Sequence, residues 1–196
     1  MLIEIPRRID TARLMMRCPR NGDGLLLQAM QTETMAGLRP WMHWAQEPPK
    51  PDDCEIYCRR MQARFILRED LVWFVFERDG GHEPGRLVAS VGLHRIDWGV
   101  RRFEIGYWRR SGCGGQGFVT EAVRALTRLC FAELDARRVE IRMDHTNVPS
   151  WKVAERAGFT LDGVLRQDSL SVDGKPRDTR VYSRVPGASG SAQDTV

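Results

Sequence analysis

The chain has 196 residues, of which 42% are hydrophobic and 29% are charged, and its formal net charge is +4. This composition is that of an ordinary globular protein, and the length suits one domain with a sizeable core. Because no apolar run is long enough to span a membrane and the start shows no secretory signal pattern, we expect no membrane anchor and a cytoplasmic location. The cysteines are odd in number and scattered, so we expect reduced thiols, no disulfide framework and no metal site.

The predicted elements begin with a strand over residues 11–17. Asp23 follows a turn and is a candidate cap for a first helix. A loop from Arg39 to Pro51, rich in Trp and Pro, separates that helix from a second one, which Asp52 or Asp53 can cap. Three strands follow without an intervening helix, at residues 71–78, 87–95 and 101–108. A polar hairpin loop over residues 79–85 joins the first two of them.

The second half of the chain starts with a glycine-rich turn from Ser111 to Gly117 and a helix that carries Glu121 in its first turn. The remaining elements are a strand, a short helix and a closing hairpin, at residues 138–143, 148–157, 159–170 and 177–184. This order of elements indicates a single mixed α/β domain over residues 1–185. Residues 186–196 are small, polar and aperiodic, so we expect a disordered tail.

The turn from Ser111 to Gly117 contains four glycines and lies between a strand and the start of a helix. Glycines let the backbone approach a ligand closely, free amides point at the ligand, and the helix dipole favours negative charge. The sequence therefore predicts a ligand that carries phosphates. Neither the P-loop nor the dinucleotide fingerprint fits, since no Gly-Lys-Ser/Thr tripeptide occurs and the turn does not open a repeated βαβ unit.

Three motifs stand out along the chain: Glu104–Trp108 with Gly115–Ala122, then Asn147–Phe159, and upstream the aromatic segment Leu38–Trp44. The first resembles the acetyl-CoA motif of the GNAT N-acetyltransferases. More narrowly, all three are similar to the RimJ/RimL branch of that family, which acetylates protein amino termini. The likeness extends from about Arg13 to Val185 and involves several ordered motifs, so it identifies a family better than it identifies a substrate.

The resemblance implies the α/β (α+β) GNAT fold, a mixed and mostly antiparallel sheet flanked by helices, in which two central parallel strands splay apart. Here those strands are residues 103–108 and 138–143, and the splay would hold the pantetheine arm of acetyl-CoA like an added strand. The implied cofactor contacts are Tyr107, Trp108, Gly112, Cys113, Gly114, Gly115, Gln116, Gly117 and Asn147. Gly112 stands where relatives usually have Gln or Arg, which leaves only the backbone amides at that position.

For catalysis, the resemblance assigns Glu104 as a general base acting through a water on the acceptor ammonium. It assigns Ser150 as proton donor to the departing sulfur. From the residues alone, Glu104 is equally an ion-paired strand carboxylate, and Ser150 and Asn147 are better explained as helix-start residues with a capping role. The branch has a second glutamate where this chain has Ser169. Its neighbour Asp168 points to the opposite face of a regular strand unless a bulge intervenes, so the base is Glu104, Asp168 or water alone.

The resemblance places Trp41 and Trp44 in the wall of an acceptor channel, while the residues alone also fit an apolar cover over the core. We therefore expect an acetyl-CoA-dependent N-acetyltransferase, monomeric or homodimeric, that acts by direct transfer on a primary amine. The amine is a protein amino terminus or a small molecule. An acetyl-enzyme on Cys113 and a non-catalytic acyl-CoA-binding regulator are the alternatives. Dispersed Arg and Lys residues and the lack of an RNA motif argue against a nucleic-acid partner.

Overall fold

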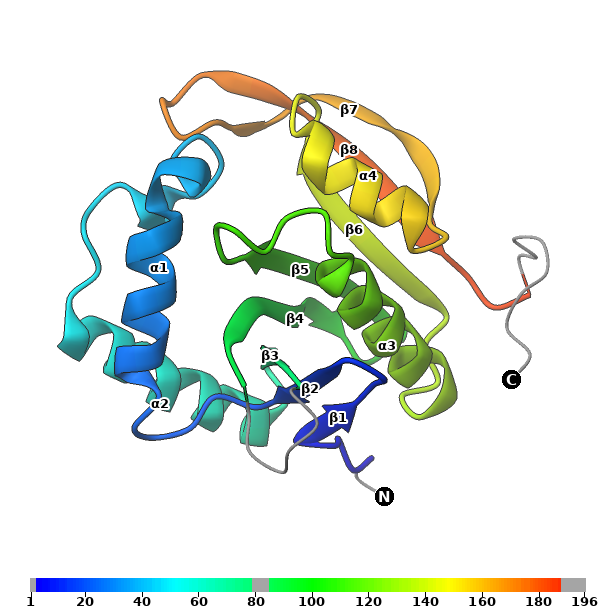
Figure 1. Ribbon diagram of the computed structural model, residues 1–196. Helices are drawn as coiled ribbons and strands as arrows, with labels where there is room; N and C mark the ends of the chain where they lie inside the picture. Colours follow the sequence, from blue (N-terminus) through cyan, green and yellow to red (C-terminus); the bar gives the residue numbers. More distant parts are fainter. Residues whose placement is uncertain (1–2, 79–84, 188–196) are drawn as a thin grey trace.

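The computed structural model describes residues 3–78 and 85–187 of the chain. Within this part, the strands form one eight-stranded sheet in the spatial order β1-β2-β3-β4-β5-β6-β8-β7 (Figure 1). The strands are β1 (Arg8–Asp10), β2 (Leu14–Arg17), β3 (Leu71–Glu77), β4 (Leu87–Asp97), β5 (Arg102–Arg109), β6 (Arg138–Asp144), β7 (Thr160–Leu170) and β8 (Pro176–Arg184). The helices are α1 (Gly24–Leu38), the short 3-10 helix η1 (His43–Ala45), α2 (Pro51–Leu67), α3 (Phe118–Ala132) and α4 (Val148–Arg156). The predicted tail from residue 188 onward and most of the predicted hairpin loop, residues 79–84, lie outside the described residues.

Every strand pair in the described sheet is antiparallel except that of β5 with β6. The predicted mixed and mostly antiparallel sheet is therefore confirmed, and the predicted strands from β3 to β8 are correct to within two residues at each end. The parallel pair follows from the connection between its strands. Because α3 links the end of β5 to the start of β6, the chain returns to the same edge and runs in the same direction.

The parallel pairing is short. The register runs only from Arg102 beside Arg138 to Glu104 beside Glu140, although both strands continue well beyond these residues. The two strands therefore separate over their C-terminal parts, which confirms the predicted splay. The backbone edges that face each other across the gap are left unpaired by the sheet.

Helices cover both faces of the sheet, which explains why β3 is apolar throughout. Alternate residues of Leu71–Phe76 belong to two hydrophobic clusters, one with buried side chains of α3 and the other with those of α1 and α2. Figure 1 shows α3 and α4 side by side on the face toward the viewer. All the cysteines are free thiols. No helix in the described ranges is long and apolar enough to cross a bilayer.

The first predicted strand, residues 11–17, is wrong in its first half. The Thr11 amide donates to the Leu14 carbonyl at 2.9 Å, and Thr11 Oγ1 accepts from the Leu14 amide at 3.0 Å. These bonds close a turn, so only Leu14–Arg17 is extended, and the preceding strand β1 was not predicted. A threonine side chain that bonds to nearby backbone competes with strand pairing in this way.

The predicted helix caps are also wrong. Asp23 stands at the start of α1, but its carboxylate accepts from the Arg17 guanidinium at 2.6 Å instead of capping the helix. Helix α2 begins at Pro51, with Asp52 and Asp53 in its first turn rather than at the cap position. Negative charge in the first turn interacts favourably with the helix dipole, so these aspartates still stabilise the helix that they were predicted to cap.

Candidate active site

A channel of about 480 Å³ lies where β5 and β6 separate, a volume within the range of small-molecule sites. Its lining comes from both strands, from the segment after α1, from the start of α4 and from the turn between β7 and β8. The main lining segments are residues 40–43, 105–109, 141–144 and 169–172. Figure 1 shows the β7–β8 hairpin extending toward one end of α1, and residues 169–172 of this hairpin line the channel. The unpaired strand edges in the channel can bind an extended ligand as an added strand.

The glycine-rich turn leads from β5 into the N-terminus of α3. Gly115 and Gly117 have φ angles of 76° and 80°, a left-handed conformation that glycine adopts without strain. The backbone amides from Gly114 to Thr120 donate to no protein group among the described residues. Free amides at the N-terminus of a helix favour a bound anion, so this turn has the geometry of the predicted phosphate site.

The residues of this turn that were predicted to contact the cofactor do not all line the same space. Cys113, Gly115 and Gly117 line the groove in front of the turn. A Cβ atom on Gly114 would lie 3.0 Å from the Arg109 guanidinium, so that glycine allows an arginine to approach the turn. The Gln116 carbonyl accepts from Arg13 at 2.9 Å. Gly112 also has a left-handed φ angle, 79°, but does not line the groove.

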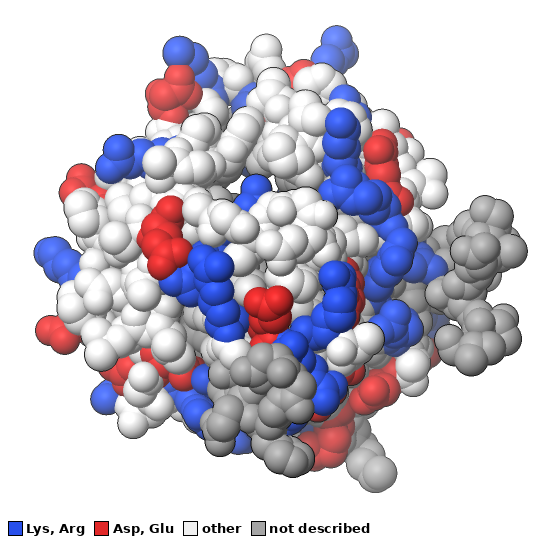
Figure 2. Space-filling model, in the orientation of Figure 1, with Lys and Arg blue, Asp and Glu red and all other residues white. Residues whose placement is uncertain are grey.

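A groove of about 980 Å³ lies in front of this turn, between α3 and α4. Its charged lining residues are Arg13, Arg109, Glu121, Arg124, Arg128, Lys152 and Arg156. The one carboxylate is already engaged, because Glu121 binds Thr11 Oγ1 and Arg13 Nη2, each at 2.6 Å. Figure 2 shows Lys and Arg side chains around this part of the molecule. The excess of cations suits a polyphosphate.

The groove and the channel meet. Arg109, Val119, Pro149 and Val153 line both of them, so the two spaces form one continuous site. A ligand with phosphates at one end and an extended polar chain at the other fits this site along its length. Acetyl-CoA, which has a pyrophosphate and a pantetheine arm, has this composition.

Glu104 lies at the closed end of the splay, where the pairing of β5 with β6 stops. Its neighbour Ile105 is among the residues that line the channel, and Glu104 is not. Burial raises the pKa of the Glu104 carboxyl, against Arg95 and Arg142, which lower it. Arg95 Nη1 lies 3.3 Å from Glu104 Oε2. A carboxyl whose pKa is raised toward neutral pH is suited to take up and release a proton.

Asn147 and Ser150 both line the channel. Asn147 also caps α4, because its Oδ1 accepts from the Ser150 amide at 3.2 Å, so the helix-start interpretation and the site interpretation hold together. Tyr107, which also lines the channel, donates to the Ser150 carbonyl at 2.8 Å and accepts from Ser150 Oγ at 3.3 Å. Burial raises the pKa of Tyr107, so its phenol keeps its proton. Sequence reasoning placed Tyr107 among the cofactor contacts and missed this link.

The strand β7 is irregular where the branch of relatives has its second glutamate. Leu165 pairs with Thr179 and Ser169 with Arg177, so β7 contains extra residues there, and Gln167 has a φ angle of 50°. This is the bulge whose presence the sequence could not establish. Ser169 lines the channel.

Asp168, the other predicted candidate for the base, is engaged in an ion pair. Its carboxylate accepts from Arg142 Nη2 at 3.0 Å, and Arg142 rather than Asp168 lines the channel. Both candidate carboxylates therefore pair with an arginine, Asp168 with Arg142 and Glu104 with Arg95. Of the two, Glu104 is the one that lies at the closed end of the splay.

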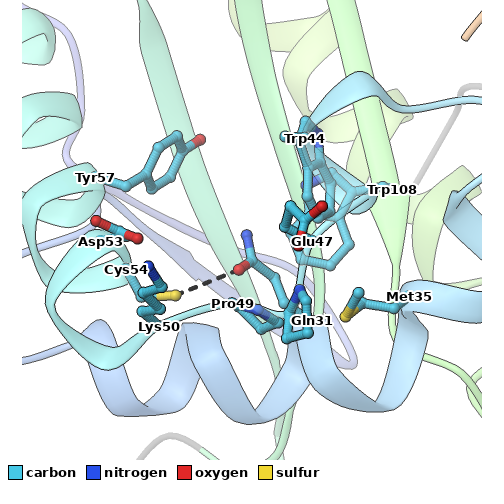
Figure 3. Close-up of a pocket in the computed structure, with 11 residues that line it drawn as sticks. Gln31, Met35, Trp44, Glu47, Pro49, Lys50, Asp53, Cys54, Tyr57 and Trp108 are labelled. Carbon is cyan, nitrogen blue, oxygen red and sulfur yellow. Dashed lines mark hydrogen bonds between the residues drawn. The ribbon is translucent and has the colours of Figure 1, made fainter.

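Trp41 lines the channel, but Trp44 lines a separate cavity of about 300 Å³ between α1 and α2. Figure 3 shows Trp44 beside Trp108 on one side of this cavity, with Tyr57 and Asp53 of α2 on the other. The Trp44 and Trp108 ring centroids are 5.1 Å apart. Trp108 lines both spaces, so the Trp44–Trp108 pair is the wall that separates them.

The cations of the groove were not predicted from the sequence. Arg124 and Arg128 are four residues apart on α3, and Lys152 and Arg156 are four apart on α4. Residues at this spacing share one face of a helix, so the signal was present in the sequence. What the sequence did not contain was the packing of α3 beside α4, which brings the two pairs to the same groove.

Known proteins resemble this chain over most of its length. The model of the acetyltransferase (GNAT) domain matches residues 13–160. The ribosomal-protein-serine acetyltransferase of Escherichia coli (strain K12) is 30% identical over 151 residues, 76% of this chain and 79% of that protein. The Bacillus subtilis (strain 168) N-acetyltransferase YdaF is 39% identical over 99 residues, half of this chain and only 54% of its own length.

Solved structures share this fold. Among them is RimL, a ribosomal L7/L12 alpha-N-protein acetyltransferase, in complex with coenzyme A. The match has a TM-score of 0.80 and 20% identity, and covers 89% of this chain and 95% of that one. The likeness therefore concerns the arrangement of the helices and strands.

Proposed function

The chain belongs to the acetyltransferase (GNAT) family, and we propose that it transfers the acetyl group of acetyl-CoA to the amino terminus of a protein. Acetyl-CoA is the donor in this family. The observation that carries the proposal is the continuity of the channel between β5 and β6 with the basic groove at the N-terminus of α3. The groove suits the phosphates of this substrate, and the unpaired strand edges suit its extended arm.

Direct transfer needs a neutral amine, a polarised thioester carbonyl and a proton for the departing thiolate. Glu104 takes the proton from the acceptor ammonium through a water, and the freed amine attacks the thioester carbon. The carbon–sulfur bond then breaks and Ser150 or Tyr107 supplies the proton to the sulfur. The attacking nitrogen gives up its second proton as the amide forms, and this proton restores the donor hydroxyl. The raised pKa of Glu104 and the retained proton of Tyr107 suit these two tasks. In this scheme the amine attacks the donor directly, without an acetyl-enzyme on Cys113.

Two observations support a protein amino terminus as the acceptor. The E. coli relative, aligned over 79% of its length, is named for acetylating a ribosomal protein serine. In addition, the channel is bounded by the segment around Trp41 and by the β7–β8 turn around Ser169 and Ser171, polar and aromatic groups that an extended peptide can contact. The proposal includes a cytoplasmic location, which the ribosomal-protein acceptor in the name of the E. coli relative supports.

The test is thiol release from acetyl-CoA with a panel of acceptors. The panel contains peptides with free Ser, Ala and Met amino termini, the same peptides blocked at the amino terminus, polyamines and amino sugars. We expect turnover on the free peptides and none on the blocked ones. Turnover on small amines alone would contradict the acceptor class. Binding of acetyl-CoA without turnover on any acceptor would indicate a non-catalytic acyl-CoA-binding protein.

A further inference from the structure

His94 on β4 is held by a carboxylate at the start of the neighbouring strand. Its Nδ1 lies 2.6 Å from Asp70 Oδ1, and Arg64 of α2 lies 3.5 Å from the other oxygen of the same carboxylate. A carboxylate in this position orients the imidazole and favours the tautomer with its hydrogen on Nδ1, which leaves Nε2 as a proton acceptor. Within the described residues, Nε2 takes part in no hydrogen bond with the protein.

Two glycines make room for this imidazole. A Cβ atom on Gly92 would lie 2.8 Å from His94 Nε2, and one on Gly106 would lie 2.7 Å from His94 Cδ2. Both distances are shorter than a van der Waals contact, so larger residues at these positions would displace the ring. The imidazole therefore lies flat against β4 and β5. Because Gly106 also lines the channel, the ring is packed against a segment of the channel wall.

Glu104 lies on the same face of the sheet as this imidazole. It is the register partner of His94, and strand alternation places it on the same side of β5 as Gly106. The register then breaks at Arg95, which has a φ angle of 44° and whose guanidinium lies 3.3 Å from Glu104. Bulges that turn a charged side chain toward a carboxylate are typical of functional sites.

The two side chains differ in their contact with solvent. The Glu104 side chain is 18% exposed, whereas that of His94 is 37% exposed. A buried base that takes a proton in each turnover needs a route by which the proton leaves. His94 has an Nε2 atom without a hydrogen bond to the described residues and is in contact with solvent.

We propose that His94, oriented by Asp70, receives from Glu104 the proton that Glu104 takes from the acceptor ammonium, and releases it to solvent. The inference rests on the proposed function, in which Glu104 is the base. In the first step the O–H bond of the Glu104 carboxyl breaks and an N–H bond forms at His94 Nε2, directly or through one water. In the second step the imidazolium gives this proton to bulk water, and both groups return to their starting states.

Ionisable groups from each neighbouring element surround His94, Asp70 and Glu104: Tyr57 and Arg64 from α2, Arg95 on β4, and Glu140 and Arg142 on β6. The carboxylates contribute negative charge to this cluster and the three arginines contribute positive charge.

The test is the rate of thiol release by the His94→Ala variant as a function of added imidazole. We expect kcat to fall about tenfold or more and to recover with imidazole, which replaces the missing proton acceptor. The wild-type chain should show no such dependence on imidazole. His145→Gln changes an exposed histidine outside the site and is the matched control, with kcat unchanged.

A second variant, Asp70→Asn, keeps the shape of the side chain and removes its charge. We expect it to lower kcat and shift the pH–rate profile while binding of acetyl-CoA and the unfolding temperature stay unchanged. If His94→Ala keeps wild-type kcat, or loses activity that imidazole does not restore, the relay is wrong and the role of Glu104 stands. If the wild-type chain acetylates no acceptor at all, the proposed function fails and the relay fails with it.

Discussion

The hydroxyl of Tyr107 on β5 donates to the main-chain carbonyl of Ser150 on α4 at 2.8 Å, and accepts from Ser150 Oγ at 3.3 Å. This pair joins the two walls of the channel at the position from which α4 starts. It also places a phenol beside the Ser150 hydroxyl. The two hydroxyls therefore form one hydrogen-bonded unit, to which the proposed mechanism assigns proton donation.

We expect Tyr107→Phe and Ser150→Ala each to lower kcat by about 10- to 100-fold, since each variant breaks the chain that delivers the proton. Because the two groups act together, the double variant should lose little more than the worse single variant. The measurement is kcat at saturating substrates, with the dissociation constant of acetyl-CoA as the control for binding. Losses that multiply in the double variant would show that the two hydroxyls act independently.

The pH dependence of the reaction should report Glu104. Burial raises the pKa of this carboxyl, and the base must be ionised, so activity is lost as the pH falls through the raised value. The acid limb of kcat/KM should therefore lie above the ordinary carboxyl range of about 4 to 4.5. Glu104→Gln should lower kcat/KM by about 100-fold or more and remove that limb. An acid limb that persists in Glu104→Gln would assign the base to another group.

Substitution of Arg95 tests the same acid limb of the pH–rate profile in a second way. Arg95 lowers the pKa of Glu104 and is itself largely exposed, so its removal should leave the fold intact. Without this cation the pKa of Glu104 rises further, and the acid limb of Arg95→Ala should move to higher pH while the rate on the alkaline side stays close to that of the wild type. A limb that moves to lower pH has the wrong sign for this interaction. Arg60→Ala, on the exposed face of α2, is the matched control.

Features with a local cause could be predicted from the sequence. The apolar run Leu71–Phe76 predicts a strand, and the glycines from Gly112 to Gly117 predict a turn at a helix start that has the geometry of an anion site. Interactions between distant segments could not be predicted. No local signal shows that the Asp23 carboxylate binds Arg17 instead of capping the helix. No local signal shows that Trp44 packs against Trp108 and lines a second cavity.

The basic groove should determine the affinity for acetyl-CoA without affecting the chemical step. Arg128 and Lys152 line the groove from α3 and α4 and lie away from the channel. Removal of either cation should raise the KM for acetyl-CoA by about tenfold at low salt, with kcat unchanged, and the difference should shrink as salt screens the charges. The measurement is KM across an ionic-strength series. A fall in kcat at saturating acetyl-CoA would place these residues in the chemistry instead.

Substitutions of the two tryptophans after α1, Trp41 and Trp44, should have different effects. Trp41 lines the channel, so Trp41→Ala should raise the KM for the acceptor peptide several-fold and leave the KM for acetyl-CoA close to that of the wild type. Trp44 packs against Trp108 and does not line the channel, so Trp44→Ala should lower the free energy of unfolding by about 1 kcal/mol through loss of that aromatic contact. The measurements are acceptor saturation curves and chemical denaturation of both variants. Because Trp108 borders both spaces, an acceptor KM that rises equally in the two variants would mean that the acceptor reaches beyond the Trp44–Trp108 wall.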